Sequence, residues 1–265
     1  MMKILITGAN SYIGTSFEKY MAQWPESYQV DTVDMIDGSW REKDFFGYDC
    51  VYHVAGVAHI KETKENAHVY YEVNRDLALE TAEKAKKCGV KQFVFLSTMA
   101  VYGIEEGMIT RDTIPTPKSN YGKAKFEAEE KLVELQNDMF AVAIMRPPMV
   151  YGNGCKGNYQ SLVKYAKIMP IFPDYKNKRS MINIERLCWF VKQIVDHQSD
   201  GLFFPQDESY ICTCQMVQKI AEEHGKKMFM LRALNPFVSL VKIFTKKGKK
   251  AFGDLYYEMI ETNWK

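Results

Sequence analysis

The sequence lacks a net charge of either sign, long apolar runs and a recognisable set of metal ligands. Its 265 residues include 35 basic and 33 acidic ones, for a formal charge of +2, so no overall field attracts nucleic acid. No apolar stretch approaches the roughly 20 residues that cross a bilayer, and we expect no integral membrane segment. A strand-like run already begins at Lys3, which leaves no space for a cleavable leader. We therefore expect a cytoplasmic protein.

The six cysteines are few and scattered, at positions 50, 88, 155, 188, 212 and 214. Without an export signal they are expected to be reduced thiols. Cys212 and Cys214 are too close together for the usual CxxC redox or zinc motif, and no histidine pair accompanies them. We interpret His53 and His59 as packing or loop residues. The sequence therefore predicts no metal site.

What is present is an alternation of short apolar runs with longer amphipathic segments through the first 150 residues. The predicted strands cover residues 3–7, 30–34, 50–54, 92–97 and 141–145, and the predicted helices cover residues 12–24, 67–88 and 121–137. The strands show little polar alternation, which is typical of a parallel sheet covered by helices on both faces. Repeated units of this kind predict an α/β fold with a doubly wound parallel sheet, the Rossmann type.

The pattern changes after Pro148. We predict a helix over 159–168, a strand over 180–184 and a helix over 185–197, followed by a more irregular, basic and aromatic stretch. The link over 34–49 is too short for a full crossover helix, so we predict an irregular loop that carries a tryptophan. The second half is therefore expected to form a smaller cap beside the sheet.

Residues 8–14, GANSYIG, stand between the first predicted strand and the first predicted helix. Gly8 and Gly14 put backbone N–H groups and a helix N-terminus where a pyrophosphate can bind. Ser11 occupies the place where such turns often carry a second glycine, but its side chain is small and its hydroxyl could donate to a phosphate. An ordinary turn is the alternative explanation for the glycines alone.

Asp34 ends the second predicted strand, 20 residues past Gly14. A carboxylate at this point accepts hydrogen bonds from the adenosine ribose and repels a 2′-phosphate, which favours NAD over NADP. A turn-forming aspartate is the alternative for this residue by itself. The order of strand, glycine turn, helix, strand and acid nevertheless predicts a dinucleotide site.

Tyr121 and Lys125 lie four residues apart and therefore on one face of a predicted helix. A nearby ammonium favours phenolate, so we expect Lys125 to lower the pKa of Tyr121. Thr98 follows the fourth predicted strand, at the edge where parallel sheets bind ligands, and could hydrogen-bond a substrate oxygen. Each residue alone has a structural explanation. Together they predict alcohol-to-ketone chemistry with a nicotinamide.

The chain resembles the extended short-chain dehydrogenases/reductases, the NAD-dependent epimerase/dehydratase family. The matching segments, in the family's order, are ITGANSYIG, HVAG at 53–56, Asn74, LSTMAVYG, YGKAK and RPPMVYG. The resemblance implies a catalytic trio of Thr98, Tyr121 and Lys125, with Tyr121 as general base and acid. It also implies a set of NAD-binding residues: Gly8, Asn10, Ser11, Tyr12, Ile13, Gly14, Asp34, Ala55, Gly56, Ser97, Tyr121, Lys125 and Pro147.

The resemblance extends into the second half through CKGNYQSLVKYAK and NKRSMINIERL, which are similar to the nucleotide-sugar branch. It implies that Asn158 and Arg179, together with Thr98, bind the substrate, with Arg179 on the pyrophosphate. Met99 and Ala100 stand where sugar 4,6-dehydratases carry an Asp-Glu pair, which argues against dehydration. We expect a dinucleotide-binding domain over 1–150 and mainly a substrate-binding cap over 151–265, with some segments returning to the sheet.

The resemblance favours a UDP-hexose or UDP-N-acetylhexosamine 4-epimerase that works through a 4-keto intermediate in surface polysaccharide biosynthesis. An NAD(P)H-dependent 4-ketoreductase of a UDP-6-deoxy-4-hexosulose would use the same residues. A non-catalytic dinucleotide sensor on the same fold is a third alternative. A homodimer is an expectation from the relatives. The five lysines of segment 242–250 indicate either a solvated face or a membrane-surface patch.

Overall fold

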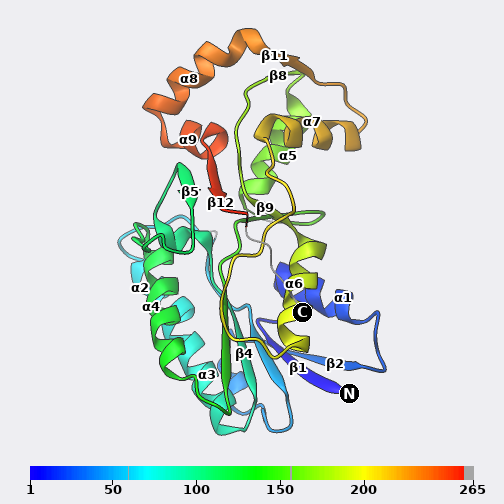
Figure 1. Cartoon of the computed structure of the whole chain (residues 1–265), viewed down its shortest axis with the longest axis vertical. Helices are drawn as coiled ribbons and strands as arrows, with labels where there is room; N and C mark the ends of the chain where they lie inside the picture. Colours follow the sequence, from blue (N-terminus) through cyan, green and yellow to red (C-terminus); the bar gives the residue numbers. More distant parts are fainter. Residues whose placement is uncertain (59, 156, 260–265) are drawn as a thin grey trace.

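A parallel β-sheet forms the centre of the protein, shown as a computed structural model in Figure 1. The structure describes residues 1–58, 60–155 and 157–259, and the side chains of residues 158 and 246 lie outside this description. Within these residues the sheet has six parallel strands in the order β10-β6-β4-β3-β1-β2. They are β1 (Met2–Thr7), β2 (Tyr28–Val33), β3 (Cys50–His53), β4 (Gln92–Leu96), β6 (Ala141–Met145) and β10 (Gly201–Phe203).

Successive strand residues point to opposite sides of the sheet. Because both sets are apolar, helices cover both faces. Ile4 and Ile6 pack into a core with the first helix layer, whereas Leu5 between them packs into a core with the second. The first layer contains α1 (Tyr12–Met21) and α6 (Ile184–Asp196), and the second contains α2 (Ala67–Tyr71), α3 (Leu77–Lys87) and α4 (Asn120–Glu134). The predicted doubly wound α/β fold is thus confirmed.

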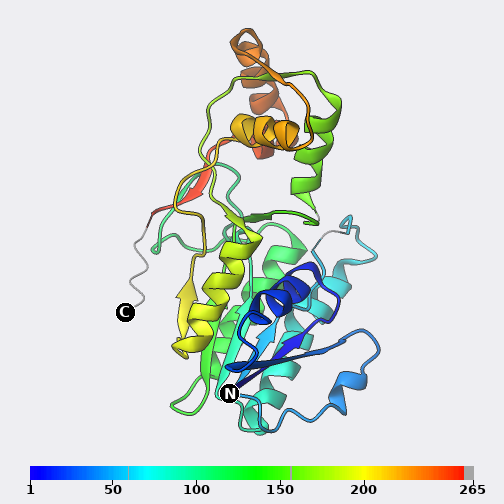
Figure 2. The same ribbon diagram turned by 90° about the vertical axis from the view of Figure 1, so that its right-hand side faces the viewer.

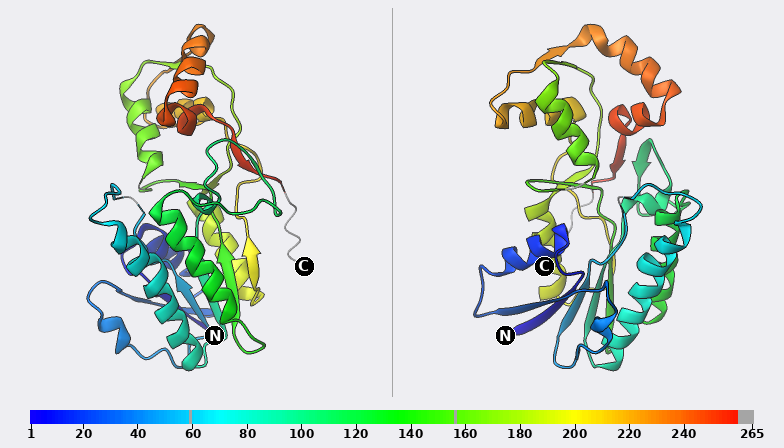
Figure 3. Two further views of the ribbon diagram at one scale, coloured as in Figure 1. Left: turned by 90° about the vertical axis from the view of Figure 1, so that its left-hand side faces the viewer. Right: turned by 180° about the vertical axis from the view of Figure 1, so that it is seen from behind.

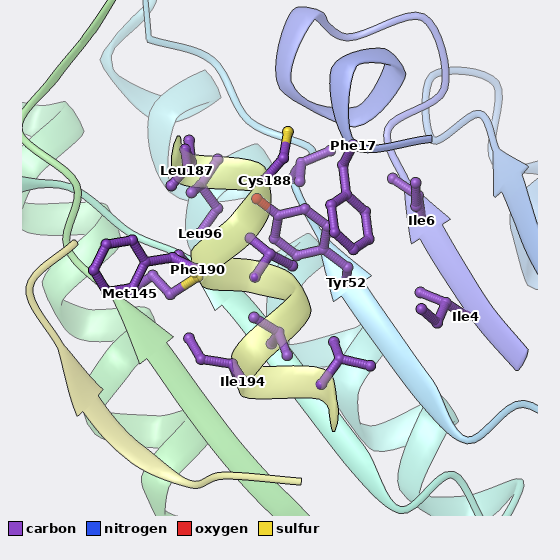
Figure 4. Packing of buried hydrophobic residues seen from close by; sticks show 14 of the residues in the cluster. Ile4, Ile6, Phe17, Tyr52, Leu96, Met145, Leu187, Cys188, Phe190 and Ile194 are labelled. Atoms are coloured by element: carbon purple, nitrogen blue, oxygen red, sulfur yellow. The ribbon is translucent and has the colours of Figure 1, made fainter. Parts of the chain in front are cut away.

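The first layer shows how closely the apolar side chains pack (Figure 4). Phe17 of α1 meets the ring of Tyr52 from β3 edge to face, with ring centroids 5.2 Å apart. Leu187 and Ile194 of α6 are fully buried in the same cluster. Because residues 184–203 supply both α6 and β10, part of the second half of the chain returns to the sheet.

Helix boundaries differ from the sequence prediction in one informative place. The helix predicted over 67–88 is interrupted by a π-helical turn over Glu72–Asp76, which buries Asn74. Turns of this kind widen the backbone spiral locally and are frequent at functional sites. The link over 34–49 is irregular as predicted, with a short 3₁₀ turn over Ser39–Arg41 and Trp40 buried.

Three further pairs of short strands lie outside the central sheet, all parallel, among the described residues. They are β7 (Met149–Tyr151) with β9 (Met181–Asn183), β8 (Ile171–Pro173) with β11 (Phe229–Leu231), and β5 (Gly107–Ile109) with β12 (Leu255–Tyr257). The strand predicted over 180–184 therefore exists as β9, but it pairs with β7 beyond the end of β6 and does not extend the main sheet.

A smaller unit, which we call the cap, lies beyond the carboxyl ends of the sheet strands (Figures 1 and 2). It consists of residues 158–173 and 213–252 and contains β8, β11, α5 (Asn158–Ile168), α7 (Thr213–Glu223), α8 (Asn235–Phe244) and α9 (Lys246–Phe252). Its core includes Phe172, Met216 and Ile220. Figure 3 shows the cap standing apart from the helix layers when the molecule is seen from the side and from behind. In the part of the chain that the structure describes, no helix is both long and apolar enough to cross a membrane.

Candidate functional site

The glycine turn joins β1 to α1 and requires glycine at its first position. Gly8 has φ +99°, and a Cβ placed on it would lie 2.9 Å from the backbone nitrogen of Ala55. Only glycine allows this approach without moving the chain. Asn10 takes a left-handed conformation at φ 64°, which asparagine tolerates better than most residues. The turn therefore brings the start of α1 against the loop that follows β3.

Ser11 is the N-cap of α1 and accepts a hydrogen bond from the Gly14 N–H at 3.1 Å. Its backbone is extended, with φ −71° and ψ 148°, so this position does not need a glycine. The hydroxyl accepts in this bond and keeps its own proton for another acceptor. The departure from a glycine-rich pattern thus stabilises the helix start and leaves a donor at the turn.

Tyr12 and Ile13 direct their side chains into the protein. Ile13 packs against the core of the first helix layer. A Cβ on Gly152 would lie 3.3 Å from Tyr12 Oη, and this buried hydroxyl has no hydrogen-bond partner among the described atoms. Burial raises the pKa of Tyr12. These two residues fix α1 against its surroundings rather than presenting charged or ionised groups.

Asp34 directly follows β2 and lies beside the glycine turn. The Val33 carbonyl accepts hydrogen bonds from the N–H groups of Gly8 at 2.9 Å and Ala9 at 3.0 Å. The Asp34 carboxylate is exposed and accepts from the Ile36 N–H at 2.9 Å. One carboxylate oxygen is thus used in a local turn, while the group as a whole remains open to solvent next to the start of α1.

Asn74 fixes the loop that follows β3. Its side-chain amide donates to the Val57 carbonyl and accepts from the Val57 N–H, each at 3.0 Å. A Cβ on Gly56 would lie 2.8 Å from Asn74 Oδ1 and 3.4 Å from Lys125 Nζ. The missing side chain at Gly56 therefore lets the lysine of α4 reach this loop. The sequence placed Asn74 in a motif but gave it no role, because the π turn that aims it has no simple pattern.

Lys125 lies in the interior with its ammonium group at the end of β4. It is 3% exposed, and Nζ donates to the Leu96 carbonyl at 2.9 Å and lies 4.4 Å from the centroid of the Phe95 ring. Burial lowers the pKa of Lys125 to about 7, against a smaller opposing effect of Glu129. The lysine thus titrates near neutral pH.

Tyr121 and Thr98 complete this group. Thr98 directly follows β4, and Tyr121 stands at the second residue of α4, whose N-cap is Ser119. Burial raises the pKa of Tyr121 to about 12, and a hydrogen bond with Thr98 partly offsets this rise. The pKa of Tyr121 is therefore raised, where we expected Lys125 to lower it, because burial of the phenol dominates and the opposing effect comes from Thr98. The Lys125 ammonium is bonded to the Leu96 carbonyl instead.

Gly122 explains how closely α4 approaches the loop after β4. A Cβ on Gly122 would lie 2.8 Å from the carbonyl oxygen of Ala100. The tyrosine before it and the threonine at the strand end can therefore meet. The Tyr-Gly-Lys order thus has a packing reason as well as a chemical one.

Ser97 and Pro147 follow the strands β4 and β6, and Ser97 belongs to a buried polar network. Ser97 is buried and donates its hydroxyl to Glu129, while the Pro147 carbonyl accepts from the Met99 N–H at 3.0 Å. Glu129 forms a buried ion pair with Arg146, which also donates to Tyr102 Oη at 2.7 Å. The sequence did not identify this ion pair, although the spacing of Tyr121, Lys125 and Glu129 by four residues was a usable signal.

His53 is a packing residue, as predicted. Its Nδ1 is hydrogen-bonded to Thr7 Oγ1 at 2.8 Å, and its ring stacks against Phe93 and Phe95. Burial keeps its pKa well below the usual value, so the ring stays neutral. His59 lies outside the described residues.

Two residues of the second half, Asn158 and Arg179, are expected to contact the substrate. Arg179 is joined to the C-terminal segment, where Nη1 donates to the Gly253 carbonyl at 3.0 Å. Its burial lowers its pKa, with Asp254 opposing, and its backbone pairs with Ile211. Asn158 is the first residue of α5, and its side chain is outside the description. The structure thus places Lys125 beside the loop after β3, which the glycine turn also approaches, and bonds Arg179 to the C-terminal segment.

Comparison with known proteins agrees with this arrangement. The profile of the NAD dependent epimerase/dehydratase family matches residues 4–172. The chain belongs to this family. It is therefore an enzyme of the epimerase/dehydratase type, and NAD is the cofactor that the family's description names. The resemblance inferred from the motifs is confirmed.

Two relatives match most of the chain. A UDP-glucose 4-epimerase of Vibrio cholerae is 30% identical over 256 residues, which cover 86% of this chain and 77% of that protein. An N-acetyl-alpha-D-glucosaminyl-diphospho-ditrans,octacis-undecaprenol 4-epimerase of Escherichia coli O157:H7 is 25% identical, covering 85% of this chain and 73% of that protein. Among solved structures, UDP-glucuronic acid 4-epimerase from Bacillus cereus in complex with NAD has a TM-score of 0.70 at 18% identity, over 94% and 97% of the two chains. This last likeness shows a shared fold.

The residues present fit a bound NAD. Gly8 has no side chain, so the backbone of the turn lies close to the loop after β3. The turn leads directly into the N-terminus of a ten-residue helix, and helix N-termini attract phosphate. An exposed carboxylate, Asp34, stands beside it. At the other end, Lys125 supplies a buried amine next to Gly56. A pyrophosphate, an adenosine ribose and a nicotinamide ribose would thus each meet a group of matching chemistry, in that order.

Proposed function

We propose that the chain is a 4-epimerase of a UDP-hexose or UDP-N-acetylhexosamine that works through a 4-keto sugar. The observation that carries the proposal is the meeting of Thr98, Tyr121 and Lys125 at the carboxyl end of β4, beside Gly56. The names of the Vibrio cholerae and Escherichia coli relatives support position 4 of the sugar as the reacting carbon. They also support a diphosphate-linked sugar as the substrate class.

When held by the glycine turn, Asp34 and Lys125, NAD would supply the hydride chemistry that an epimerisation at C4 requires. Tyr121 Oη, as phenolate, removes the proton of the C4 hydroxyl and gives it back after the keto sugar has turned over. With a pKa of about 12, the phenol is protonated at neutral pH, so the phenolate needs stabilisation during this step. The Thr98 hydroxyl, which hydrogen-bonds the phenol, supplies it and also holds the substrate oxygen.

The cofactor residues divide by the part of NAD that each would hold. The turn binds the pyrophosphate through its backbone N–H groups and the Ser11 hydroxyl, Asp34 binds the adenosine ribose, and Lys125 binds the nicotinamide ribose. The other members of the proposed set line the same surface or fix its shape: Gly8, Asn10, Tyr12, Ile13, Gly14, Ala55, Gly56, Ser97, Tyr121 and Pro147.

The substrate end is assigned to the second half. We propose a dinucleotide-binding domain over 1–150 and a mainly substrate-binding region over 151–265. Arg179 would bind the pyrophosphate of the sugar nucleotide, because the bond to Gly253 uses one of the five N–H donors of the guanidinium. Asn158 would contact the diphosphate or nucleoside. The product then serves synthesis of a surface polysaccharide.

Incubation of purified protein without added cofactor tests the reaction. UDP-glucose, UDP-N-acetylglucosamine and a polyprenyl-diphosphate-linked N-acetylglucosamine are offered in separate reactions. Formation of the C4 epimer of a UDP-sugar supports the proposal, because an epimerase regenerates its own NAD. Conversion of the lipid-linked sugar alone would move the proposal to that substrate. Consumption of a UDP-4-keto sugar only when NAD(P)H is supplied would replace the epimerase with a 4-ketoreductase.

The substitution Tyr121→Phe tests the mechanism. Loss of the phenolic hydroxyl removes the proton acceptor, so turnover should fall by about 10²- to 10⁴-fold, while NAD binding, followed by the quenching of protein fluorescence, stays within about twofold. Tyr20→Phe on α1 is the matched control and should retain full turnover. An undiminished rate in Tyr121→Phe would remove the tyrosine from the chemistry.

A further inference from the structure

The charge of the chain is strongly uneven. Residues 224–253 contain eight of the 35 basic residues, Lys226, Lys227, Arg232, Lys242, Lys246, Lys247, Lys249 and Lys250, and none of the 33 acidic ones. The other 235 residues therefore carry 27 basic and 33 acidic residues. A formal charge of +2 conceals a cationic segment on an otherwise acidic protein. This segment forms the outer part of the cap.

The same segment exposes large apolar side chains. On α8, Phe237, Leu240 and Phe244 follow one another at the i, i+3 and i+7 spacing of a helix face and are all exposed, whereas Val238 on the opposite face is buried. Ile243 widens this stripe. On the neighbouring strand β11, Phe229 and Leu231 are also exposed. Figure 1 shows α8, β8 and β11 together at the end of the cap farthest from the sheet.

Exposed cationic groups lie on the elements next to these apolar residues. Lys226 and Lys227 are exposed just before β11, with Lys227 Nζ 5.4 Å from the centroid of the Phe229 ring. Lys247 and Lys250 are exposed on α9, which packs against α8. Among the basic residues of this segment whose side chains the structure describes, Lys242 forms an ion pair with Glu106 and Arg232 forms one with Asp174. We call this surface of Phe229, Leu231, Phe237, Leu240, Ile243 and Phe244 with Lys226, Lys227, Lys247 and Lys250 the basic apolar face.

We propose that the basic apolar face docks on the surface of an anionic phospholipid bilayer. A helix with an apolar stripe and flanking lysines lies in the headgroup region, with its apolar side chains in the acyl boundary. The negative surface potential of the bilayer attracts each lysine close to it. With ten residues, α8 is about 15 Å long, too short to span the roughly 30 Å hydrocarbon core. Docking is therefore interfacial.

The charge pattern separates this partner from two others. A second copy of the chain, placed face to face by a two-fold axis, would bring two acid-free cationic segments together, which is unfavourable. A nucleic acid would match the charge but would leave the aliphatic stripe of α8 in water. A bilayer surface satisfies both the lysines and the apolar residues. The inference goes beyond the proposed reaction and does not depend on it.

Vesicle co-sedimentation of the full chain without substrate tests the proposal. Vesicles of phosphatidylcholine alone are compared with vesicles of roughly three parts phosphatidylcholine to one part phosphatidylglycerol. We expect binding to the anionic vesicles at low salt, at least tenfold weaker binding to the neutral ones, and a similar loss at about 1 M salt, where screening acts within about 3 Å. Equal binding to both compositions, or none to the anionic vesicles, overturns the proposal. So does binding of heparin or DNA in the absence of vesicle binding.

Matched variants localise the contact. The combined change Phe237→Ser, Leu240→Ser and Phe244→Ser should abolish sedimentation with anionic vesicles. Phe46→Ser is its control, since Phe46 in the 34–49 link and Phe244 are both 79% exposed, and it should bind like the wild type. Unchanged melting temperatures establish that the variants fold. An unaffected triple variant overturns the proposal, and so does a triple variant that converts a dimer to a monomer in sedimentation equilibrium.

A lysine series separates attraction by charge from apolar contact. Lys227→Gln, Lys247→Gln and Lys250→Gln together should weaken binding by about 100-fold, because each lysine near such a surface adds roughly fivefold. Lys64→Gln, Lys87→Gln and Lys131→Gln remove the same charge from exposed positions of the sheet half and should have little effect. Equal losses in the two sets would show that only net charge matters and would overturn the assignment to this face.

Discussion

The sheet half and the cap differ in where they keep their polar and apolar groups. Around the sheet, Ser97, Glu129 and Arg146 are buried and bonded to one another, while the apolar strand residues are enclosed by helices. In the cap, strands of three residues pair far from the sheet, and phenylalanines such as Phe237 and Phe244 face outward.

The groups proposed for chemistry thus lie in the half with buried polar networks, and those proposed for membrane contact lie in the half with exposed apolar residues. Buried polar groups in a fixed network hold nearby side chains in one geometry, and their burial shifts pKa values. Exposed charges act weakly one by one and strongly as a group. We therefore expect single substitutions to have large effects in the sheet half, while effects in the cap need several substitutions at once.

The largest expected effect comes from breaking the ion pair of Glu129 with Arg146. Glu129→Ala leaves a buried guanidinium without its carboxylate and should reduce the free energy of unfolding by about 3–5 kcal/mol. In the cap, Arg232 forms an ion pair with Asp174 and its side chain is 81% exposed. Arg232→Met breaks this pair and should reduce the free energy of unfolding by about 0–1 kcal/mol. Urea unfolding of the two variants measures both values.

A double variant sharpens this first comparison. Glu129→Leu with Arg146→Met removes both charges, so it should be more stable than Glu129→Ala although it loses more hydrogen bonds. If Glu129→Ala and Arg232→Met lose the same stability, the contrast between buried and exposed pairs does not hold in this protein.

The second prediction concerns the buried amine of Lys125. With a pKa of about 7 in the folded chain and an ordinary value near 10.4 when unfolded, the unfolded state binds more protons between these values. Stability therefore rises with pH from about 7 to about 10, and the cost of the buried ammonium is fully present below pH 7. At pH 6, Lys125→Met should have a higher free energy of unfolding than the wild type. At pH 9 this advantage should be smaller by roughly 2.5 kcal/mol.

Thermal unfolding without NAD at the two pH values provides the measurement. Leu132→Met, a non-titratable change at another buried position of α4, should give the same stability difference at both. A pH-independent difference for Lys125→Met would mean that the lysine keeps an ordinary pKa despite its burial.

The sequence predicted the sheet half more fully than the cap for a physical reason. The fifth predicted strand over 141–145 matches β6 residue for residue, because covered parallel strands are short apolar runs between clear turns. In the cap, β8 and β11 have three residues each and lie far apart in the chain, so no local pattern predicts their pairing. Register there depends on long-range packing.

The candidate site divides in the same way. Spacing alone put Tyr121 and Lys125 on one helix face, and strand order brought Thr98 to them. The direction of the tyrosine's pKa shift was predicted wrongly, because it depends on how completely the fold excludes water from the phenol. The partners Asn74 and Glu129 were not assigned, since a π turn and a buried ion pair are properties of the assembled structure.

The third prediction compares two glycines, one from each region. Gly8 and Gly225 both have positive φ, +99° and +68°, but only at Gly8 would a Cβ meet another backbone, while nothing lies within 4 Å at Gly225. Gly225→Ala should cost about 1 kcal/mol from conformation alone. Gly8→Ala adds the contact with Ala55 and should cost about 2 kcal/mol. It should also weaken NAD binding in calorimetry, which Gly225→Ala should not. Equal losses for the two would remove the close approach as the reason for glycine at position 8.

The smallest expected effect belongs to Asp34, the charged candidate of the sheet half that remains exposed. Asp34→Asn keeps an oxygen for the Ile36 N–H and removes the charge, so stability should stay within about 0.5 kcal/mol. NAD affinity should fall about tenfold with the loss of a charged acceptor for the ribose, and NADP affinity should rise because repulsion of the 2′-phosphate ends. Titration with both cofactors gives their affinity ratio, with Asp37→Asn in the same link as control. A ratio that does not move would show that Asp34 serves the turn alone, and its place beside Gly8 would have no part in choosing the cofactor.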